Sequence, residues 1–432
     1  MQDIYEKQKN ILQNFKKYFK NLYSLDSFNY CSFISNSLGS EFFKRNSKRK
    51  YYINFLKEYF KELISLGFIK EITLVSKSVK NYENIILSWG FKKDYKKNFY
   101  DKYFNINSSK YKKTHWIVIY MSKKLPKKIP ENNTIVQIER NRIFNIISFF
   151  KNIFFLLNYL NFNIKSIFLF CSSQVLISVK LEKIISKNIN FSNTKKIFIP
   201  YESQLFQKKF ISQARVKNNK IKIFGFDHTA PQPIPVNLYH DSFSPDFLIV
   251  TSKNKINFNN KFLNWPIKKQ KLMKSFRFKI NKKEFKSVIF LPYIIESEEI
   301  YLTKLRKLMS YLNIKDFKKF KIKNHPAKEN SKKHNNLIFK IKNLYNNNFE
   351  LFSKNKIKNT TIFLGQTTAI PLALETGLSC FNIVLDEVFG VYNPSIWKGL
   401  KLFSVEKNIF KYSLAKKNSL IKIGSTYNKL KI

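Results

Sequence analysis

The sequence is short of the residues that interrupt regular structure and of those that cross-link it. Its 432 residues include 9 glycines, 12 prolines and 3 cysteines. Cys31, Cys171 and Cys380 lie far apart, so neither a disulfide framework nor the paired spacing of a zinc site is present. We therefore expect buried thiols in a reducing cytoplasm.

Two nucleotide-binding signatures are also missing. Neither Gly-x-Gly-x-x-Gly nor Gly-x-x-x-x-Gly-Lys-Ser/Thr occurs, which disfavours dinucleotide oxidoreductases and P-loop ATPases. No His, Asp and Glu residues have the spacing of metal ligands, and no Asp-x-Asp follows an expected strand. We expect no cofactor and a metal-independent reaction.

No targeting or membrane-spanning segment is apparent. The N-terminus lacks the basic region and apolar run of a signal peptide, and no apolar run approaches the roughly 20 residues of a membrane span. The longest apolar stretch, residues 143–170, is interrupted by Lys151, Lys165 and several asparagines. We expect a buried helix followed by a buried strand there, with a helix on a membrane surface as the alternative. The expected location is the cytoplasm, with peripheral contact to the inner face of the membrane left open.

Acidic residues are scarce. There are 28 of them against 79 Lys and Arg, which gives a formal net charge of +51. Such a field attracts nucleic acid, anionic lipid headgroups or anionic substrates. An AT-rich coding sequence would also produce a chain this rich in Lys, Asn, Ile, Phe and Tyr, so drift in composition is the favoured explanation of most of the charge.

What the chain does contain is an alternation of strand-like and helix-like segments. Apolar residues make up 44% of it, enough for large cores, and its length suits two or three domains of roughly 150 residues. Strands are expected at residues 71–76, 115–121, 166–170, 196–200, 220–226, 247–251, 287–291, 317–323, 361–364, 380–384 and 401–404. Helices are expected at 52–64, 79–89, 173–186, 203–216, 296–311, 337–345 and 367–376.

This alternation predicts βαβ units and an α/β fold, with two Rossmann-like domains that face a central cleft. The predicted organisation comprises an N-terminal acceptor domain with a helical extension (1–255), a basic interdomain connection (256–286) and a C-terminal nucleotide-donor domain (287–404). A last segment (405–432), expected to be partly helical, would pack back on the N-terminal domain.

Two strand ends in the second half carry the groups that a phosphate requires. The expected strand 361–364 leads through a turn at Gly365 into a helix that begins at Thr367 or Thr368. Hydroxyl side chains cap the free N–H groups of a helix start, and these N–H groups also bind phosphate. His325 follows the expected strand that ends at Lys323, so both ends should face one crevice. We expect this crevice to hold the phosphate or diphosphate of a nucleotide-linked donor.

These motifs resemble a known family. The Asn-His-Pro at 324–326 and the Gly-x-Thr-Thr-Ala-x-x-x-x-x-Glu at 365–375 resemble the C-terminal half of GT-B-fold glycosyltransferases. They are especially similar to bacterial transferases of capsule and lipopolysaccharide synthesis, including sialyl- and polysialyltransferase-like enzymes. Residues 199–204, 225–229 and 244–246 are similar to a surface-carbohydrate biosynthesis group. The resemblance covers about residues 195–385.

The resemblance implies that His325, Thr367 and Thr368 contact the phosphate of a nucleotide sugar, CMP- or UDP-linked, and that Glu375 binds the ribose hydroxyls. The acceptor would be a glycan or a lipid-linked glycan. Two departures are visible. Thr-Thr stands where Ser-Ser or Ser-Thr is usual, and the acidic motif that supplies the base in sialyltransferases is missing.

The residues themselves suggest further roles. A protonated imidazole at His325 could donate to a phosphate oxygen as the glycosidic bond breaks, and Lys323 or Arg277 could neutralise phosphate charge. A base for the acceptor hydroxyl is expected at a strand end of the first domain. Glu202 is the first candidate; Asp227 and His228 are the next, with Asp227 able to orient the histidine.

Other functions remain open at this point. Glycerophosphotransferases and nucleotide-sugar 2-epimerases share the expected fold and a similar His-Pro motif. The basic and aromatic stretch 91–116 suits a nucleic-acid-binding protein, but no nucleic-acid motif accompanies it. A noncatalytic subunit on the membrane surface is the last alternative.

Overall fold

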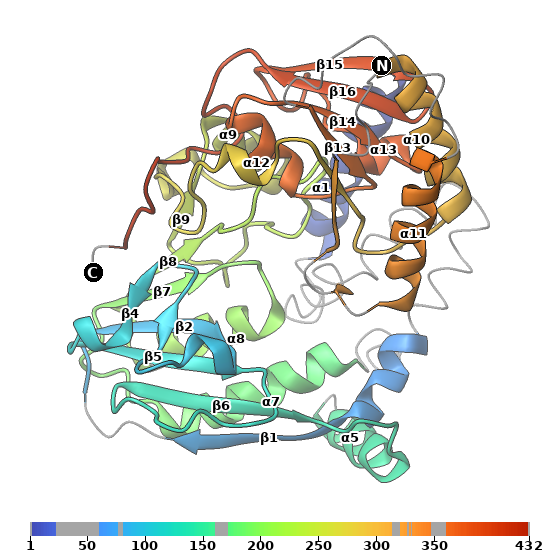
Figure 1. Ribbon diagram of the computed structural model, residues 1–432. Coiled ribbons are helices and arrows are strands. Elements are labelled where there is room, and N and C mark those ends of the chain that lie inside the picture. The colour runs from blue at the N-terminus through green and yellow to red at the C-terminus, as the bar shows by residue number, and fades with distance from the viewer. Residues whose placement is uncertain are drawn as a thin grey trace.

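The computed structural model describes residues 2–22, 60–76, 81–159, 172–312, 320–325, 328–329, 331–346 and 360–430, and the statements below refer to these residues. They form two α/β domains, each built around one large sheet (Figure 1). The predicted architecture of two α/β domains around a cleft is confirmed.

The first domain contains an eight-stranded sheet in the order β1-β6-β5-β2-β7-β8-β9-β10. Only β1 runs antiparallel to its neighbour, and the other adjacent pairs are parallel. The strands are β1 (Ile69–Ser76), β2 (Asn84–Gly90), β5 (Thr114–Tyr120), β6 (Asn133–Arg140), β7 (Lys196–Pro200), β8 (Lys222–Phe226), β9 (Phe247–Val250) and β10 (Gln270–Leu272). Two short strands, β3 (Tyr100–Asp101) and β4 (Ile106–Asn107), pair separately.

Helices cover this sheet. They are α5 (Ile146–Tyr159), α7 (Ser173–Asn188), α8 (Leu205–Lys217) and α9 (Lys253–Leu263), with the 3-10 turn η1 (Ser65–Phe68) beside α5. Ser172 caps α7 by accepting the N–H of Val175 at 3.3 Å, and Ser252 caps α9 by accepting that of Lys255 at 3.1 Å. Serine at these positions supplies the acceptor that a helix start lacks.

Two predictions in this domain are wrong. Residues 79–89 were expected to be helical, but 84–90 form β2 at the centre of the sheet. Ile85, Ile86 and Leu87 are all buried there. A central parallel strand is covered on both faces and reads as a continuous apolar run, which periodicity does not distinguish from a buried helix. The helix expected in the stretch 143–170 forms as α5, but it is not buried, because much of its apolar surface faces solvent. The strand expected at 166–170 lies outside the described residues.

The second domain has a six-stranded sheet in the order β12-β11-β13-β14-β16-β15. The first four strands are parallel, and β16 and β15 continue the sheet in antiparallel fashion. The strands are β11 (Val288–Phe290), β12 (Lys321–Lys323), β13 (Thr360–Leu364), β14 (Ser379–Ile383), β15 (Leu400–Glu406) and β16 (Ile409–Leu414); the helices are α10 (Glu298–Leu312), α11 (Lys332–Asn346), α12 (Ala369–Glu375) and α13 (Glu387–Gly390).

Both ends of the chain cross between the domains. Near the N-terminus, α1 (Gln2–Leu22) contacts α13, and Gln8 Nε2 donates to the carbonyls of Val388 and Val391 at 2.8 Å. After β16 the chain returns to the first domain, where the N–H of Lys422 donates to Thr251 O and that of Leu430 to Phe104 O. The partial helix expected after residue 405 is wrong, because β16 occupies that stretch.

Residues 256–286, expected to connect the domains, contain most of α9 and the strand β10, which pairs with β9 in the first sheet. The domain boundaries themselves stay predictions.

Candidate functional site

In the second sheet, the order in which the chain adds strands reverses at β11. The chain moves from β11 to β12 on one side and then crosses to β13 on the other. Ligands of open α/β sheets bind at the carboxyl ends of the strands beside such a switch point. A cavity of about 370 Å³ lies there, and its wall includes residues that follow β11, β12 and β13, with residues of the first domain opposite. It is lined by Thr229, Ala230, Arg277, Phe278, Glu284, Phe285, Phe290, Leu291, Lys323, Asn324, His325, Thr367, Thr368, Ala369 and Leu372.

The turn from β13 into α12 requires glycine. Gly365 has φ +76, and a Cβ atom there would lie 2.8 Å from the hydroxyl of Tyr301. Beyond the turn, Thr367 Oγ1 accepts the N–H of Ala369 at 3.2 Å. Thr368 is exposed and its side chain makes no capping hydrogen bond. Because α12 begins at Ala369, one or two residues later than expected, and has only seven residues, the threonine hydroxyls are the main polar groups that this turn offers.

His325 faces the same cavity from the end of β12. The backbone N–H of His325 donates to Asn324 Oδ1 at 3.1 Å. Its ring packs edge to face on that of Tyr293, with the ring centres 5.0 Å apart. Burial, with help from His334 and Lys328, lowers the pKa of His325 below its ordinary value. The lowered pKa favours the neutral imidazole in the unliganded protein, whereas the expected donation to a phosphate oxygen uses the protonated ring.

Cations from both domains reach this cavity. Lys323 Nζ donates to Glu284 O at 2.9 Å and lies over the ring of Phe290. Arg277 enters from the first domain, with its guanidinium carbon 5.6 Å from the ring centre of Tyr103 and 5.3 Å from that of Phe278. An anion in this cavity would meet positive charge on two sides.

Glu202 and His228 form a pair at the carboxyl ends of β7 and β8. Glu202 Oε1 lies 3.1 Å from His228 Nε2, and Oε2 accepts from Gln204 Nε2 at 2.7 Å. The Glu202 side chain is 29% exposed and that of His228 is 3% exposed. Burial alone would raise the pKa of Glu202, but His228, Arg277 and Gln204 together hold it below its ordinary value. Arg277 thus acts electrostatically on Glu202 while it lines the cavity.

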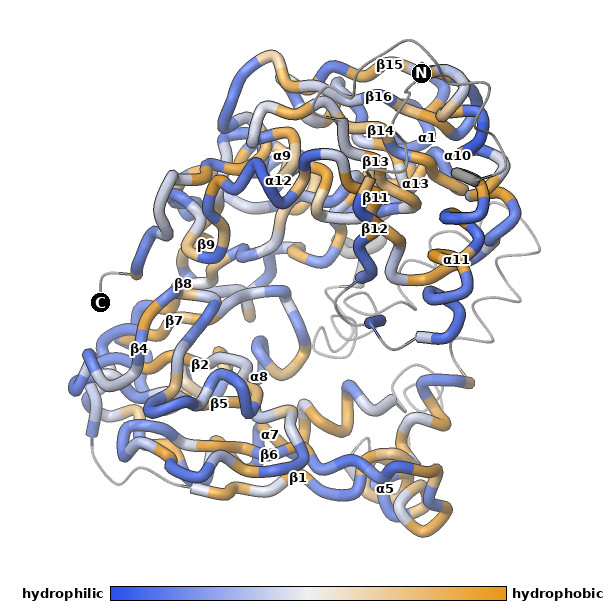
Figure 2. Tube along the Cα trace, viewed as in Figure 1, coloured by the Kyte–Doolittle hydropathy of each residue, from blue (hydrophilic) through white to orange (hydrophobic). Residues whose placement is uncertain are grey.

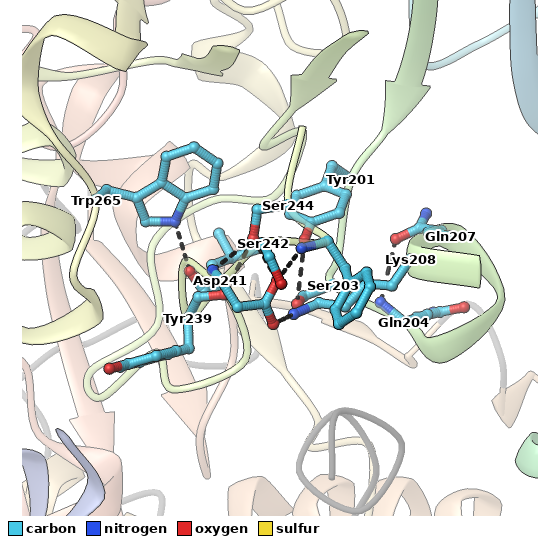
Figure 3. A network of polar contacts seen from close by, with 12 residues as sticks. Tyr201, Ser203, Gln204, Gln207, Lys208, Tyr239, Asp241, Ser242, Ser244 and Trp265 are labelled. Atoms are coloured by element: carbon cyan, nitrogen blue, oxygen red, sulfur yellow. Dashed lines mark hydrogen bonds and ion pairs between the residues drawn. The ribbon is translucent and has the colours of Figure 1, made fainter. Parts of the chain in front are cut away.

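A buried polar network supports the turn that carries Glu202 (Figure 3). Gln207 Oε1 accepts the N–H groups of Glu202 and Gln204, at 3.0 and 3.2 Å, and its Nε2 donates to Pro200 O. Ser203 between them has φ +59, which is uncommon for a residue with a side chain.

Behind that turn, the fully buried Lys208 pairs with Asp241, and Asp241 Oδ1 also accepts from Ser244 Oγ at 3.1 Å. Buried charges of this kind persist when their hydrogen-bonding capacity is satisfied. The network therefore fixes the backbone on which the Glu202 side chain stands.

Asp227 has partners other than those expected. Its Oδ2 accepts from Lys255 Nζ at 2.6 Å, and its Oδ1 accepts from Thr229 Oγ1 at 3.0 Å. Both charged side chains are buried, and burial lowers the pKa of Lys255 although Asp227 opposes the shift. Asp227 does not orient His228; Glu202 does.

Glu375 is also placed differently from the prediction. It is buried and lies outside the cavity wall. Its two carboxylate oxygens accept the N–H groups of Asn418, Leu420 and Ile421, at 2.5, 2.7 and 3.1 Å. Burial nevertheless raises its pKa. Its contacts fasten the C-terminal segment to α12 and leave no oxygen directed at a ribose.

Several residues of this region are not among the predicted site residues. Glu284 and Asn324 line the cavity, and Tyr103 packs edge to face on His228 at 4.8 Å. Asn324 belongs to the Asn-His-Pro motif, in which only His325 was assigned a role. Glu284 and Tyr103 lie in stretches without a motif, and only the tertiary fold brings them to the site.

Metal-ligand clusters and membrane-spanning helices are both absent from the part of the chain that the structure describes. No three His, Cys, Asp or Glu side chains among these residues come together in a way that could hold a metal ion. Within the same residues, every helix is too short or too polar to cross a bilayer.

The fold and cavity define a two-domain α/β protein with a polar interdomain site. The chain matches no protein-family model and no curated protein. Among solved structures it is similar to a glycosyltransferase from Rickettsia africae ESF-5, with 13% identity and a TM-score of 0.34, over 70% of this chain and 79% of that one. It is similar also to UDP-GlcNAc 2-epimerase from Methanocaldococcus jannaschii, with 10% identity and a TM-score of 0.34, over 69% of this chain and 83% of that one. At these TM-scores the similarities do not bear on activity, so the proposals below rest on the residues of this chain.

Proposed function

We propose that the protein is a glycosyltransferase that moves a sugar from a nucleotide-activated donor to a hydroxyl of a surface-polysaccharide acceptor. The observation that supports this most strongly is the interdomain cavity, which joins His325, Lys323, Thr367 and Thr368 with Arg277 from the opposite domain. Phosphate oxygens prefer this set of imidazole, hydroxyl and cationic donors.

The donor phosphates would lie against His325 and the two threonines. Glycosyl transfer leaves negative charge on the phosphate that departs, and donors already in place stabilise that charge best. Lys323 and Arg277 would offset the rest of it. In place of Glu375, the candidate acceptor for ribose hydroxyls is Glu284, an acidic residue of the cavity wall whose Oε1 accepts from Asn281 Nδ2 at 2.6 Å.

The acceptor hydroxyl needs a base on the other side of the cleft. Glu202 suits this role because it is the more exposed member of its pair and its lowered pKa keeps it ionised at neutral pH. His228 would position it through the 3.1 Å contact. The reaction written this way uses no metal.

A nucleotide panel tests the proposal. With CMP, CDP, UDP and GDP, we expect one nucleotide to raise the melting temperature of the full-length protein. The shift should be lost in His325→Ala and Thr368→Val, because each removes a hydrogen bond to a charged oxygen, worth about 1.5–3 kcal/mol.

Matched controls are His240→Ala and Thr303→Val, both outside the cavity wall. These should keep the full shift. Stabilisation by single-stranded RNA but by no nucleotide would remove the enzyme proposal. If one nucleotide sugar were converted to its epimer without transfer, the reaction would be epimerisation at the same site.

A further inference from the structure

Helix α5 turns a polar residue inward. Asn152 is buried, its Nδ2 donates to the carbonyls of Leu66 and Ile69 at 2.9 Å, and its Oδ1 accepts from Lys180 Nζ at 3.2 Å. Phe149, Ile153 and Leu156 pack inward with it. The inner face of α5 is therefore fully engaged with the first domain.

The outer face carries a row of large apolar side chains. Within the helix, Ile146, Ile147, Phe150 and Phe154 follow the spacing of one helix face and are 55%, 75%, 50% and 58% exposed. Ile143, three residues before the helix begins, is 79% exposed. These five residues are here named the α5 stripe. Phe60 and Ile64, just before η1, are exposed as well. Figure 2 shows the apolar colour of α5 at the edge of the molecule. Contiguous exposed apolar surface of this kind marks an interaction site.

The charges on the segment that carries the stripe have one sign, whereas Glu62 and Glu71 lie on the neighbouring elements. From residue 140 to residue 159 the chain carries Arg140, Arg142 and Lys151, all exposed, and no carboxylate. The preceding acid, Glu139, pairs with Lys70 at 3.2 Å. An apolar helix face flanked by cations is complementary to a surface with an apolar interior and an anionic outer layer.

We propose that the α5 stripe binds the surface of an anionic phospholipid bilayer. The isoleucines and phenylalanines enter the boundary between headgroups and acyl chains, and Arg140, Arg142 and Lys151 contact the lipid phosphates. A symmetric pairing of two copies fits less well, because it places the same three cations on both sides of the interface.

The position of α5 gives this contact a use. β6 leads into α5, and its carboxyl end lies at the same edge of the sheet as the ends of β7 and β8, three and four strands away. At about 4.8 Å per strand, the end of β7, two residues before Glu202, lies roughly 15 Å from the end of β6, which leads into α5. If the proposed function holds, a bilayer-bound protein would present its cleft to a lipid-linked acceptor. The binding itself does not depend on that function.

Vesicle co-sedimentation of the full chain tests the proposal. We expect binding to phosphatidylcholine vesicles that contain about one third phosphatidylglycerol, and weak binding to phosphatidylcholine alone. The triple variant Ile147→Ser/Phe150→Ser/Phe154→Ser should bind about 100-fold more weakly, since it removes apolar surface that enters the lipid. Unchanged circular dichroism would show that it folds, and Phe150→Ser alone serves if it does not.

The matched apolar control is Ile267→Ser/Phe339→Ser/Phe403→Ser, whose side chains are 60%, 62% and 57% exposed elsewhere. It should bind as the wild type does. For charge, Arg142→Gln/Lys151→Gln should weaken binding to anionic vesicles about tenfold, and Lys217→Gln/Lys268→Gln, also exposed, should leave it unchanged.

Three outcomes would overturn the proposal. The wild type does not bind the anionic vesicles, or each α5 variant weakens binding no more than its control does, or sedimentation equilibrium shows a dimer that the triple variant converts to a monomer. Nucleotide-dependent stabilisation is unaffected in each case, so failure here is distinct from failure of the proposed function.

Discussion

Both domains carry polar side chains at the carboxyl ends of their parallel strands, but they use them differently. In the first domain, Asp227 is saturated by Lys255 and Thr229. In the second, Thr368 is exposed and its hydroxyl caps nothing, while it lines a cavity with His325. A polar residue at a strand end therefore indicates a binding site only when the fold has not already supplied its partners. Glu202 lies between these cases, with a partner in His228 and part of its surface open.

The largest effect on activity is expected from substitution of Glu202. Glu202→Gln should lower kcat by about 10²–10⁴, because the acceptor hydroxyl loses its base, and His228→Asn should lower it less. KM and nucleotide affinity should stay near wild type. The measurement is steady-state transfer with the donor that the nucleotide panel identifies.

Glu139→Gln, which neutralises a surface carboxylate of the same domain, is the control and should transfer at the wild-type rate. If Glu202→Gln turned over normally, Glu202 would join Asp227 as a residue committed to the fold.

The next largest effect concerns stability and separates the two domains directly. Asp227→Asn should lower the free energy of unfolding by about 3–5 kcal/mol, because it leaves the buried Lys255 ammonium without its counter-charge. Thr368→Val should change it by no more than about 0.5 kcal/mol, as expected for an exposed position. Urea unfolding measures both.

The double variant Asp227→Asn/Lys255→Met removes both charges and should recover much of the loss. If Asp227→Asn were stable but had lost glycosyl transfer activity, Asp227 would belong to the active site. The proposed difference between the two domains would then be wrong.

Much of this fold could be predicted from the sequence because strand-helix alternation is a local property. The same rule brought His325 and the two threonines to one crevice, since parallel strands end at a common edge. It failed where the local pattern is ambiguous. The apolar run of β2 is also typical of a buried helix, and several apolar residues of α5 point outward although the pattern predicted a buried helix.

Site residues could be predicted only where they come directly after a parallel strand. Glu375 has the helical position that the family resemblance suggested, but the returning C-terminal segment occupies its carboxylate. Glu284 enters the cavity wall from a stretch without a motif. Both placements depend on how distant segments pack, which no spacing along the chain encodes.

The smallest predicted effect tests whether His325 meets a phosphate at all. Burial lowers the pKa of this imidazole in the free protein, and a bound phosphate should raise it again, since an anion favours the charged ring. Binding should then take up a proton, so nucleotide affinity should rise as pH falls from about 8 to about 6, by roughly three- to tenfold. Isothermal titration calorimetry in buffers of different ionisation enthalpy measures both the affinity and the proton uptake.

The nucleotide phosphate also titrates near pH 6, so His325→Gln provides the reference, since it keeps a hydrogen-bond donor but does not titrate. The difference in slope between wild type and His325→Gln isolates the imidazole. Equal slopes would mean that the ring stays neutral with nucleotide bound, and His325 would then resemble the saturated residues of the first domain rather than a ligand contact of the second.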